Sequence, residues 1–284
     1  MAAAKAPVMG RNPSKGAAER NGRVQALARA LAILNALAEA ADGTSLTEIA
    51  QQVGLPASTT HRLLNTLQHD QFVRFDQERT LWSVGVQTFV VGNAFLRNRQ
   101  LVQTARPHLR LLMEESGETA NLAVLDGNRA LCLYQVECGQ MMRAMTRLGS
   151  RLPLHCSGVG KAILQAMPER RRAKILHHHG LPRLTARTIT RPADLNTDLI
   201  HGRRLGYAVD DEEHAVGLRC VASPIYDELS EAVAAISVSG PTARITEDRI
   251  AVLGAMVKRT AETVTREYGG RRGDPVDERT NRKI

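Results

Sequence analysis

The sequence predicts an α+β protein with a small helical N-terminal domain and a larger mixed C-terminal domain. Its 284 residues, of which 43% are hydrophobic, are enough for two cores. Three helical patterns and a hairpin come first, and alternating helical and strand-like patterns follow. We expect five segments: a disordered basic arm over 1–22, the small domain over 23–85, a connecting helix over 86–100, the large domain over 101–268 and a disordered tail over 269–284.

The composition favours a cytoplasmic protein that attracts polyanions. No stretch approaches the roughly 18 uncharged apolar residues of a membrane span, and the N-terminus lacks the apolar block of a secretory signal. The four cysteines show neither CxxC nor zinc-finger spacing, so we expect reduced thiols, no metal and no cofactor. A formal net charge of +9 is consistent with nucleic-acid binding but does not establish it.

The small domain begins with a helix from Val24, which Asp42-Gly43 ends. Leucines at spacings of four and three residues predict one apolar face for it. These are Leu27, Leu31, Leu34 and Leu37.

Two further helices meet across a tight turn. Ser45 stands three residues before Glu48, the capping-box pattern in which a hydroxyl and a carboxylate satisfy free amides at a helix start. Gly54 predicts a left-handed end to this helix, and residues 58–68 form the next one. This pair has the form of a helix-turn-helix.

The third helix and the hairpin after it indicate a winged helix-turn-helix. Strand-like residues 72–75 and 80–84 are bridged by a polar loop. A DNA major groove admits one helix, which a second helix must brace, and small polar or basic side chains at its start can reach bases and phosphates. We expect arginines of the wing and of the arm to contact the backbone and the minor groove. The predicted DNA-contacting residues are Ser58, Thr59, Thr60, His61, Arg62, Arg74, Arg79 and Arg23.

The rest of the chain predicts a linker helix and a mixed domain. The linker, near 86–99, carries Phe89, Val90 and Phe95 as apolar surface for a partner subunit. Further helices are expected near 107–116, 160–166, 168–178, 193–205 and 247–267, and strands near 119–125, 130–137, 207–210, 220–226 and 232–239.

Two polar features of the large domain are compatible with an anion site. Ser157-Gly158-Val159-Gly160 opens a helix whose free amides can bind a carboxylate, although a close-packed helix start is the favoured interpretation of these residues alone. It is not a nucleotide-binding loop, because His155 and Ala162 replace residues that such a loop requires. Ser237 and Ser239 share one strand face, which is either an anion site or solvent-exposed.

Three N-terminal blocks form a recognisable combination: residues 26–34 (ALARALAIL), 55–64 (LPASTTHRLL) and 81–85 (LWSVG). Together they resemble the IclR family of bacterial transcription regulators, and the resemblance runs from about residue 24 to residue 268. Four C-terminal blocks are similar to the branch that represses allantoin and glyoxylate utilisation. These are residues 116–119, 148–155, 211–214 and 234–241.

The resemblance implies a winged helix-turn-helix, a linker helix and a GAF-like effector-binding domain, assembled as a homodimer or homotetramer on a double-stranded DNA operator. It also implies an effector pocket for a small organic acid. The implied effector-binding residues are Ser157, Gly158, Val159, Asp210, Cys220, Ser237, Val238 and Ser239, with a pocket wall of Met141, Met145, Leu152 and Leu218.

We expect a repressor that glyoxylate or a similar oxo acid releases from its operator. Helix amides and serines would hold the acid end, and Asp210 would accept a hydrogen bond from a ligand hydroxyl. A regulator of acetate or aromatic-acid catabolism is the alternative within the family. A cysteine-dependent enzyme with Cys220 as nucleophile and His155 or His214 as base is a remote alternative, since a lone strand cysteine is usually a small buried hydrophobe.

Residues 177–179 are adjacent histidines on a helix. Their side chains point in different directions, so one metal ion cannot bind all three.

Overall fold

The structure is a computed structural model that describes residues 24–40, 42–97, 100–142 and 146–272, with residues 93–97 described by their backbone alone. The predicted arm, Arg23, Met145 and the tail beyond residue 272 lie outside the described residues, as does the side chain of Phe95. The chain divides into two compact units, and the boundary in the sequence falls between Phe95 and Leu96.

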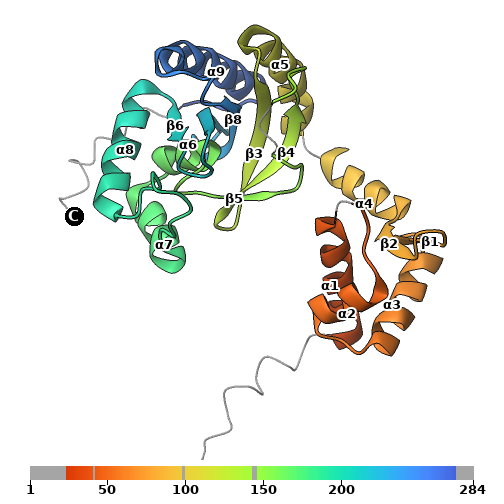
Figure 1. Cartoon of the computed structure of the whole chain (residues 1–284). Helices are drawn as coiled ribbons and strands as arrows, with labels where there is room; N and C mark the ends of the chain where they lie inside the picture. The colour runs from red at the N-terminus through yellow and green to blue at the C-terminus, as the bar shows by residue number, and fades with distance from the viewer. Residues whose placement is uncertain (1–23, 41, 98–99, 143–145, 273–284) are drawn as a thin grey trace, which may run out of the picture. The chain divides into compact units, whose positions relative to one another are not determined.

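In the described residues, the first unit contains three helices, a two-stranded antiparallel hairpin and most of a fourth helix, α4 (Val86–Arg97), which crosses the boundary between the units (Figure 1). Its elements are α1 (Gln25–Glu39), α2 (Leu46–Val53), α3 (Ala57–His69), β1 (Val73–Asp76) and β2 (Leu81–Val84). The capping box at Ser45 and Glu48 is present, and Gly54 ends α2 in the left-handed conformation at φ 65°, as the sequence predicts. The core of the unit contains Ile33, Leu37, Ile49, Leu64, Val73 and Trp82.

The predicted apolar face of α1 is only half correct. Leu37 is buried and Leu34 partly buried, but Leu27 and Leu31 are exposed. Ile33 packs into the core in their place, because α2 and α3 cover the side of α1 that carries Ile33 and Leu37. The helix therefore has two apolar faces, of which the unit covers one.

The second unit is built on a six-stranded sheet in the order β5-β4-β3-β8-β7-β6, with every neighbouring pair antiparallel. The strands are β3 (Thr119–Asp126), β4 (Arg129–Val136), β5 (Arg151–Pro153), β6 (Ala208–Asp211), β7 (Leu218–Tyr226) and β8 (Ala232–Pro241). The helices are α5 (Gln100–Ser116), α6 (Gly158–Ala166), α7 (Glu169–His179), α8 (Pro192–Leu205) and α9 (Glu247–Glu267), and α4 (Val86–Arg97) precedes them. The short strand β5 is absent from the sequence prediction.

Helices cover both faces of this sheet. α5 and α9 pack together on one face (Figure 1). The strand residues in the core that they form include the large side chains Leu122, Val221 and Ile236. The next residues along two strands, Ala123 and Ala222, belong to the core around α6 on the other face. Side chains alternate between faces along a strand, so one face carries bulk and the other leaves room for a closely packed helix.

α5 begins at Gln100, earlier than predicted, and contains Pro107 in its interior. The proline was expected to mark a helix start, because it lacks an N–H and crowds the preceding turn. Here the buried residues Leu101, Val102 and Ala105 extend the packed face on the N-terminal side of the proline. Tertiary packing therefore outweighs the local penalty that Pro107 imposes on the helix.

Among the described residues, no helix combines the length and apolarity needed to cross a membrane.

Replacing Leu64 with alanine should destabilise the first unit by about 2–5 kcal/mol, because its fully buried side chain would leave a cavity. Urea unfolding followed by circular dichroism measures this loss. Gln68→Ala is the matched control and should change the free energy of unfolding by less than about 1 kcal/mol, since Gln68 is exposed on the same helix. Equal losses for the two variants would contradict the described packing of α3.

Candidate functional site

The start of α3 presents polar and basic side chains, and no acidic residue lies in its first turn. Ser58, His61 and Arg62 are exposed and Thr59 is half-buried, so these predicted DNA-contacting residues reach the surface. The first turn of a helix also has free amides and a partial positive charge, which attract phosphate. This end of α3 is the candidate DNA-reading surface.

Thr60 does not belong to that surface. Its side chain is fully buried, and its hydroxyl donates a hydrogen bond to the Pro56 carbonyl at 3.2 Å. The prediction placed it at the surface because it follows Ser58 and Thr59, but a helix turns by about 100° per residue. We therefore leave Thr60 out of the candidate DNA-contacting set.

The wing carries Arg74 on β1 and Arg79 in the connecting loop, both exposed. Asp76 shapes this loop, because its carboxylate accepts hydrogen bonds from the amides of Glu78 and Arg79 at 3.0 and 3.1 Å. The His61 ring lies 6.4 Å from the Trp82 ring in an edge arrangement, so the reading helix rests against the wing.

The predicted effector residues converge on one small cavity in the second unit, with a free volume of about 30 Å³. We call it the effector cavity. The predicted residues that line it are Ser157, Gly158, Val159, Asp210, Cys220, Ser237, Ser239, Leu152 and Leu218. Asn121, Ala123, Cys132, Thr146 and His214 line it as well and were not predicted as binding residues.

Two predicted residues lie elsewhere. Val238 is fully buried in the core on the α5–α9 face, because the alternation of β8 that turns Ser237 and Ser239 into the cavity turns Val238 away. Met141 is 99% exposed and does not line the cavity.

A hydrogen-bonded network forms the sheet side of the cavity. The Asn121 amide on β3 donates to the hydroxyls of Ser237 and Ser239 on β8, at 3.3 and 3.2 Å. Gln135 on β4 donates to the Asn121 carbonyl at 3.0 Å and fixes the orientation of the amide. Ser239 donates to the Cys220 sulfur at 3.2 Å. The two serines are therefore buried and share a face, as the anion-site interpretation requires.

The first turn of α6 forms the opposite side. Ser157 caps the helix: its hydroxyl accepts a hydrogen bond from the Gly160 amide at 3.2 Å and donates to the Pro153 carbonyl. A Cβ on Gly158 would lie 2.6 Å from the Cys220 sulfur, so only glycine allows α6 to approach β7 this closely. The two competing interpretations of this segment therefore both apply. It is closely packed, and its amides lie beside a cavity.

Asp210 is the acidic group of the cavity and is almost fully buried. Burial raises the pKa of Asp210 to about 7, although hydrogen bonds from the amides of His214 and Glu213 to its carboxylate act in the opposite direction. The carboxyl group is therefore partly protonated near neutral pH. It can donate as well as accept a hydrogen bond, and it repels an anionic ligand less than a permanently ionised aspartate would.

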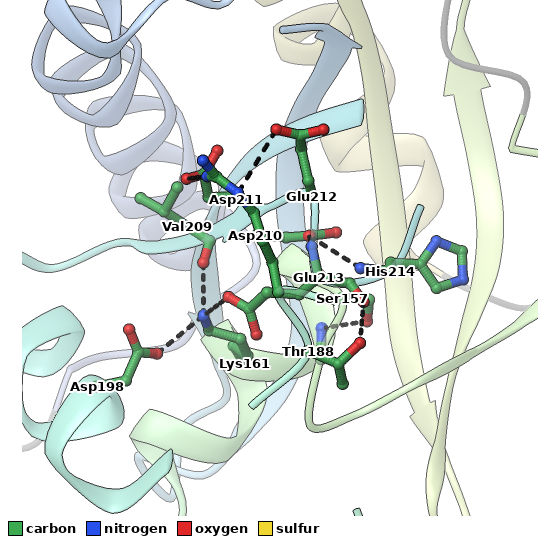
Figure 2. Close-up of polar contacts among 12 residues, drawn as sticks. Ser157, Lys161, Thr188, Asp198, Val209, Asp210, Asp211, Glu212, Glu213 and His214 are labelled. Carbon is green, nitrogen blue, oxygen red and sulfur yellow. Dashed lines mark hydrogen bonds and ion pairs between the residues drawn. The ribbon is translucent and has the colours of Figure 1, made fainter. Parts of the chain in front are cut away.

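A buried lysine connects α6 to the segment that carries Asp210 (Figure 2). The Lys161 ammonium group donates to the Val209 carbonyl at 2.6 Å and forms ion pairs with Glu213 and Asp198. Burial disfavours its charge, but the two carboxylates together hold the pKa of Lys161 above its ordinary value. Figure 2 also shows Thr188 beside this segment, where its hydroxyl donates to the Glu213 carbonyl at 2.7 Å.

The geometry gives little support to the catalytic and metal interpretations. Burial raises the pKa of the Cys220 thiol to about 11, whereas a nucleophilic cysteine needs a lowered pKa. Burial also lowers the pKa of His155 and of His214. In the part of the chain that the structure describes, no group of three His, Cys, Asp or Glu side chains is arranged to hold a metal ion.

Two family profiles match the chain. The profile of the C-terminal domain of bacterial IclR transcriptional regulators matches residues 93–266, and that of the IclR helix-turn-helix domain matches residues 26–77. The chain belongs to the IclR family. This confirms the predicted fold class and the prediction of a DNA-binding transcription regulator with a domain for small-molecule effectors.

Individual IclR-family relatives match almost end to end. The acetate operon repressor of Salmonella typhimurium is 50% identical over 93% of this chain and 97% of its own. The HTH-type transcriptional repressor AllR of Escherichia coli is 44% identical over 86% of this chain and 90% of its own. The crystal structure of the Thermotoga maritima IclR superimposes with a TM-score of 0.74 at 31% identity, over 86% of this chain and 98% of that one.

Sequence reasoning missed Asn121 and Lys161, although each had a signal. Asn121 is a polar residue in an otherwise apolar strand, on the face that Ala123 shares. Lys161 is the one charged residue of α6. A charge inside an apolar helix either reaches solvent or has buried partners, and the partners of Lys161 come from residues 37 and 52 positions further along the chain.

The raised pKa of Asp210 predicts a specific pH dependence of stability. Between an unfolded value near 3.8 and the folded value of about 7, the folded state keeps a proton that the unfolded state releases, so stability falls as pH rises through this window. Asp210→Asn cannot titrate and should lose less stability over the same range, which urea unfolding at a series of pH values measures.

The exposed Asp248→Asn provides the matched control and should follow the wild-type pH profile. Glu213, whose pKa burial also raises to about 7, repels the Asp210 charge, so the difference between wild type and Asp210→Asn contains the titration of Asp210 together with its coupling to Glu213. Identical profiles for wild type and Asp210→Asn would contradict the raised pKa.

Proposed function

We propose that the chain is a cytoplasmic repressor that leaves its operator when a small oxo acid, such as glyoxylate, fills the effector cavity. The two curated relatives described above are both repressors, which supports the direction of control. The observation that carries the effector proposal is the cavity itself, where helix amides, two serines and a partly protonated aspartate surround a small volume.

The two ends of glyoxylate match the two polar sides of this cavity. Amides of the first turn of α6 and the hydroxyls of Ser237 and Ser239 suit a carboxylate. Asp210 suits the aldehyde when protonated, and a hydroxyl of its hydrate when ionised. An isolated anion with no second polar group would leave Asp210 without a ligand partner.

The size of the cavity argues against aromatic acids. A free volume of about 30 Å³ accommodates only a few atoms, whereas an apolar cavity that takes benzene is several times larger. Val159, Leu152 and Leu218 line the cavity and limit its width. A regulator of allantoin and glyoxylate utilisation therefore fits better than a regulator of aromatic-acid catabolism.

Control of acetate metabolism is the second candidate. Its specific support is the higher identity with the acetate operon repressor, 50% against 44% for AllR. The two candidates differ in the genes that the protein controls, and both are compatible with a small acid in the effector cavity.

We further propose that the protein acts as a homodimer or homotetramer. Leu27 and Leu31 of α1 are exposed, as are Phe89 and Val90 of α4, and a second copy of the chain would cover this apolar surface. Two copies would present two α3 helices to successive half-sites of a palindromic operator. The paired subunits would adopt two arrangements, one that binds the operator and one that does not. The effector can release DNA only if it binds these two arrangements with different affinity.

Arg62→Ala should weaken binding to a selected operator duplex by about 1–3 kcal/mol while leaving binding to unrelated DNA nearly unchanged, because a base contact carries specificity. Fluorescence anisotropy with both duplexes measures the two affinities. Arg170→Ala, on exposed α7 in the second unit, is the matched control and should leave both affinities unchanged. Unaltered discrimination in Arg62→Ala would remove this residue from the reading surface.

Glyoxylate should release the wild-type protein from the same operator, and Ser239→Ala should raise the concentration needed for half-release at least tenfold, because the variant loses a hydrogen bond to a charged ligand. Operator affinity without glyoxylate should stay unchanged, as should the response of the control Thr197→Ala on the exposed side of α8. Operator affinity that does not respond to glyoxylate would refute the effector proposal.

A further inference from the structure

A second cavity of the second unit, about 330 Å³ in volume, lies among α8, the end of β7, α9 and the segment 270–272. We call it the basic cavity. A single carboxylate, that of Glu262, lines it. The cationic side chains that line it are Arg203, Lys258, Arg266, Arg271 and Arg272. Its volume falls in the range of small-molecule sites, and none of its lining residues lines the effector cavity.

Among the described residues, the cations of the basic cavity form no ion pair, and Glu262 is the one carboxylate in its lining. Across the described ranges, none of its five cationic groups lies within 4.0 Å of a carboxylate oxygen. Arg272 donates a hydrogen bond to the Arg203 carbonyl at 3.2 Å, which brings two cationic residues together. Like charges gathered in a concave surface repel one another and attract an anion.

The floor of the cavity contains a buried polar atom without a partner. Gln165 is 2% exposed, and its Oε1 accepts no hydrogen bond within the described structure. A Cβ on Gly202 would lie 2.3 Å from this oxygen, so the glycine leaves it room. A buried acceptor without a donor is costly, and a ligand hydroxyl or amide would satisfy it if the Gln165 side chain turned toward the cavity that it lines.

The other polar groups of the floor are already engaged. The Ser223 hydroxyl donates to the Gly206 carbonyl at 2.9 Å, and the Thr265 hydroxyl accepts from the Tyr226 amide at 3.2 Å. The site therefore has a floor with one unpartnered buried acceptor and a rim of cations that form no ion pair with a described residue. This arrangement fits a small molecule that carries both negative charge and a hydrogen-bond donor.

We propose that the basic cavity is a second small-molecule site, which binds an organic polyanion carrying a hydroxyl or amide donor, of the type of a phosphorylated hydroxy acid. Glyoxylate has one charge and is too small to reach several rim cations. A DNA backbone can approach the rim, but it cannot place a donor on the buried Gln165 oxygen.

Isothermal titration calorimetry of the full chain with 3-phosphoglycerate tests the proposal, because this probe has a phosphate, a carboxylate and a hydroxyl. Arg203→Ala and Arg266→Ala should each raise the dissociation constant at least tenfold. Arg204→Ala is the matched control, since Arg204 is the exposed neighbour of Arg203 on α8 and does not line the cavity. Thermal melting checks that every variant is folded.

Gln165→Met provides an independent readout of the floor. It should weaken binding of 3-phosphoglycerate severalfold but leave binding of 3-phosphooxypropionate, which lacks the hydroxyl, unchanged. The side chain is buried without a hydrogen bond to its oxygen, so methionine of similar length should be tolerated.

Four results would overturn the proposal: no saturable binding of 3-phosphoglycerate, equal affinity in all arginine variants, equal affinity for inorganic phosphate, or loss of operator binding in Arg203→Ala with probe binding intact. The last result would assign the surface to DNA. None of these measurements uses glyoxylate, so a failure of the effector proposal is distinguishable from a failure of this one.

Discussion

The arrangement of the effector-binding unit depends on one buried cation. Lys161 projects from the first full turn of α6 and bonds to Val209, Glu213 and Asp198, so it fixes the helix to the segment on either side of Asp210. The helix amides and the aspartate belong to different elements, and this link holds the two elements together. A buried ion pair contributes little net stability compared with apolar packing, so we infer that the role of Lys161 is to specify one geometry. The cavity is therefore positioned by an interaction outside its lining.

The second requirement of the effector cavity is space between α6 and the sheet, which small side chains of the sheet provide. Leu122, Val221 and Ile236 face α5 and α9, whereas alanines occupy the face toward α6. Glycine at 158 then allows the helix to approach Cys220 so closely that its amides border the cavity. The same small residues that pack the helix also expose its polar start, because a larger side chain at either place would separate helix from sheet.

The sequence rules predicted correctly those features that depend on residues close together in the chain. The capping box at Ser45, the left-handed Gly54 and the hairpin follow from residues close together in the chain, and most residues of the effector cavity followed from the family resemblance. Predictions that needed knowledge of which face a neighbour covers were less accurate, as with Leu27 and Leu31 of α1 and the burial of Thr60. Lys161 and Gln165 could not be assigned partners or a cavity, because the groups around them are distant in sequence.

The effector cavity and the basic cavity contact the same short helix, α6, at opposite ends. Gly158 and Val159 of its first turn line the effector cavity, and Gln165 of its last turn lines the basic cavity. With a rise of 1.5 Å per residue, these ends lie about 10 Å apart. Lys161 and the close contact at Gly158 hold α6 along its first half, and Gly202 of α8 packs against Gln165. If ligands at the two ends are coupled, the route that this geometry offers is a rigid-body movement of α6 against the sheet, which requires two discrete positions of the helix.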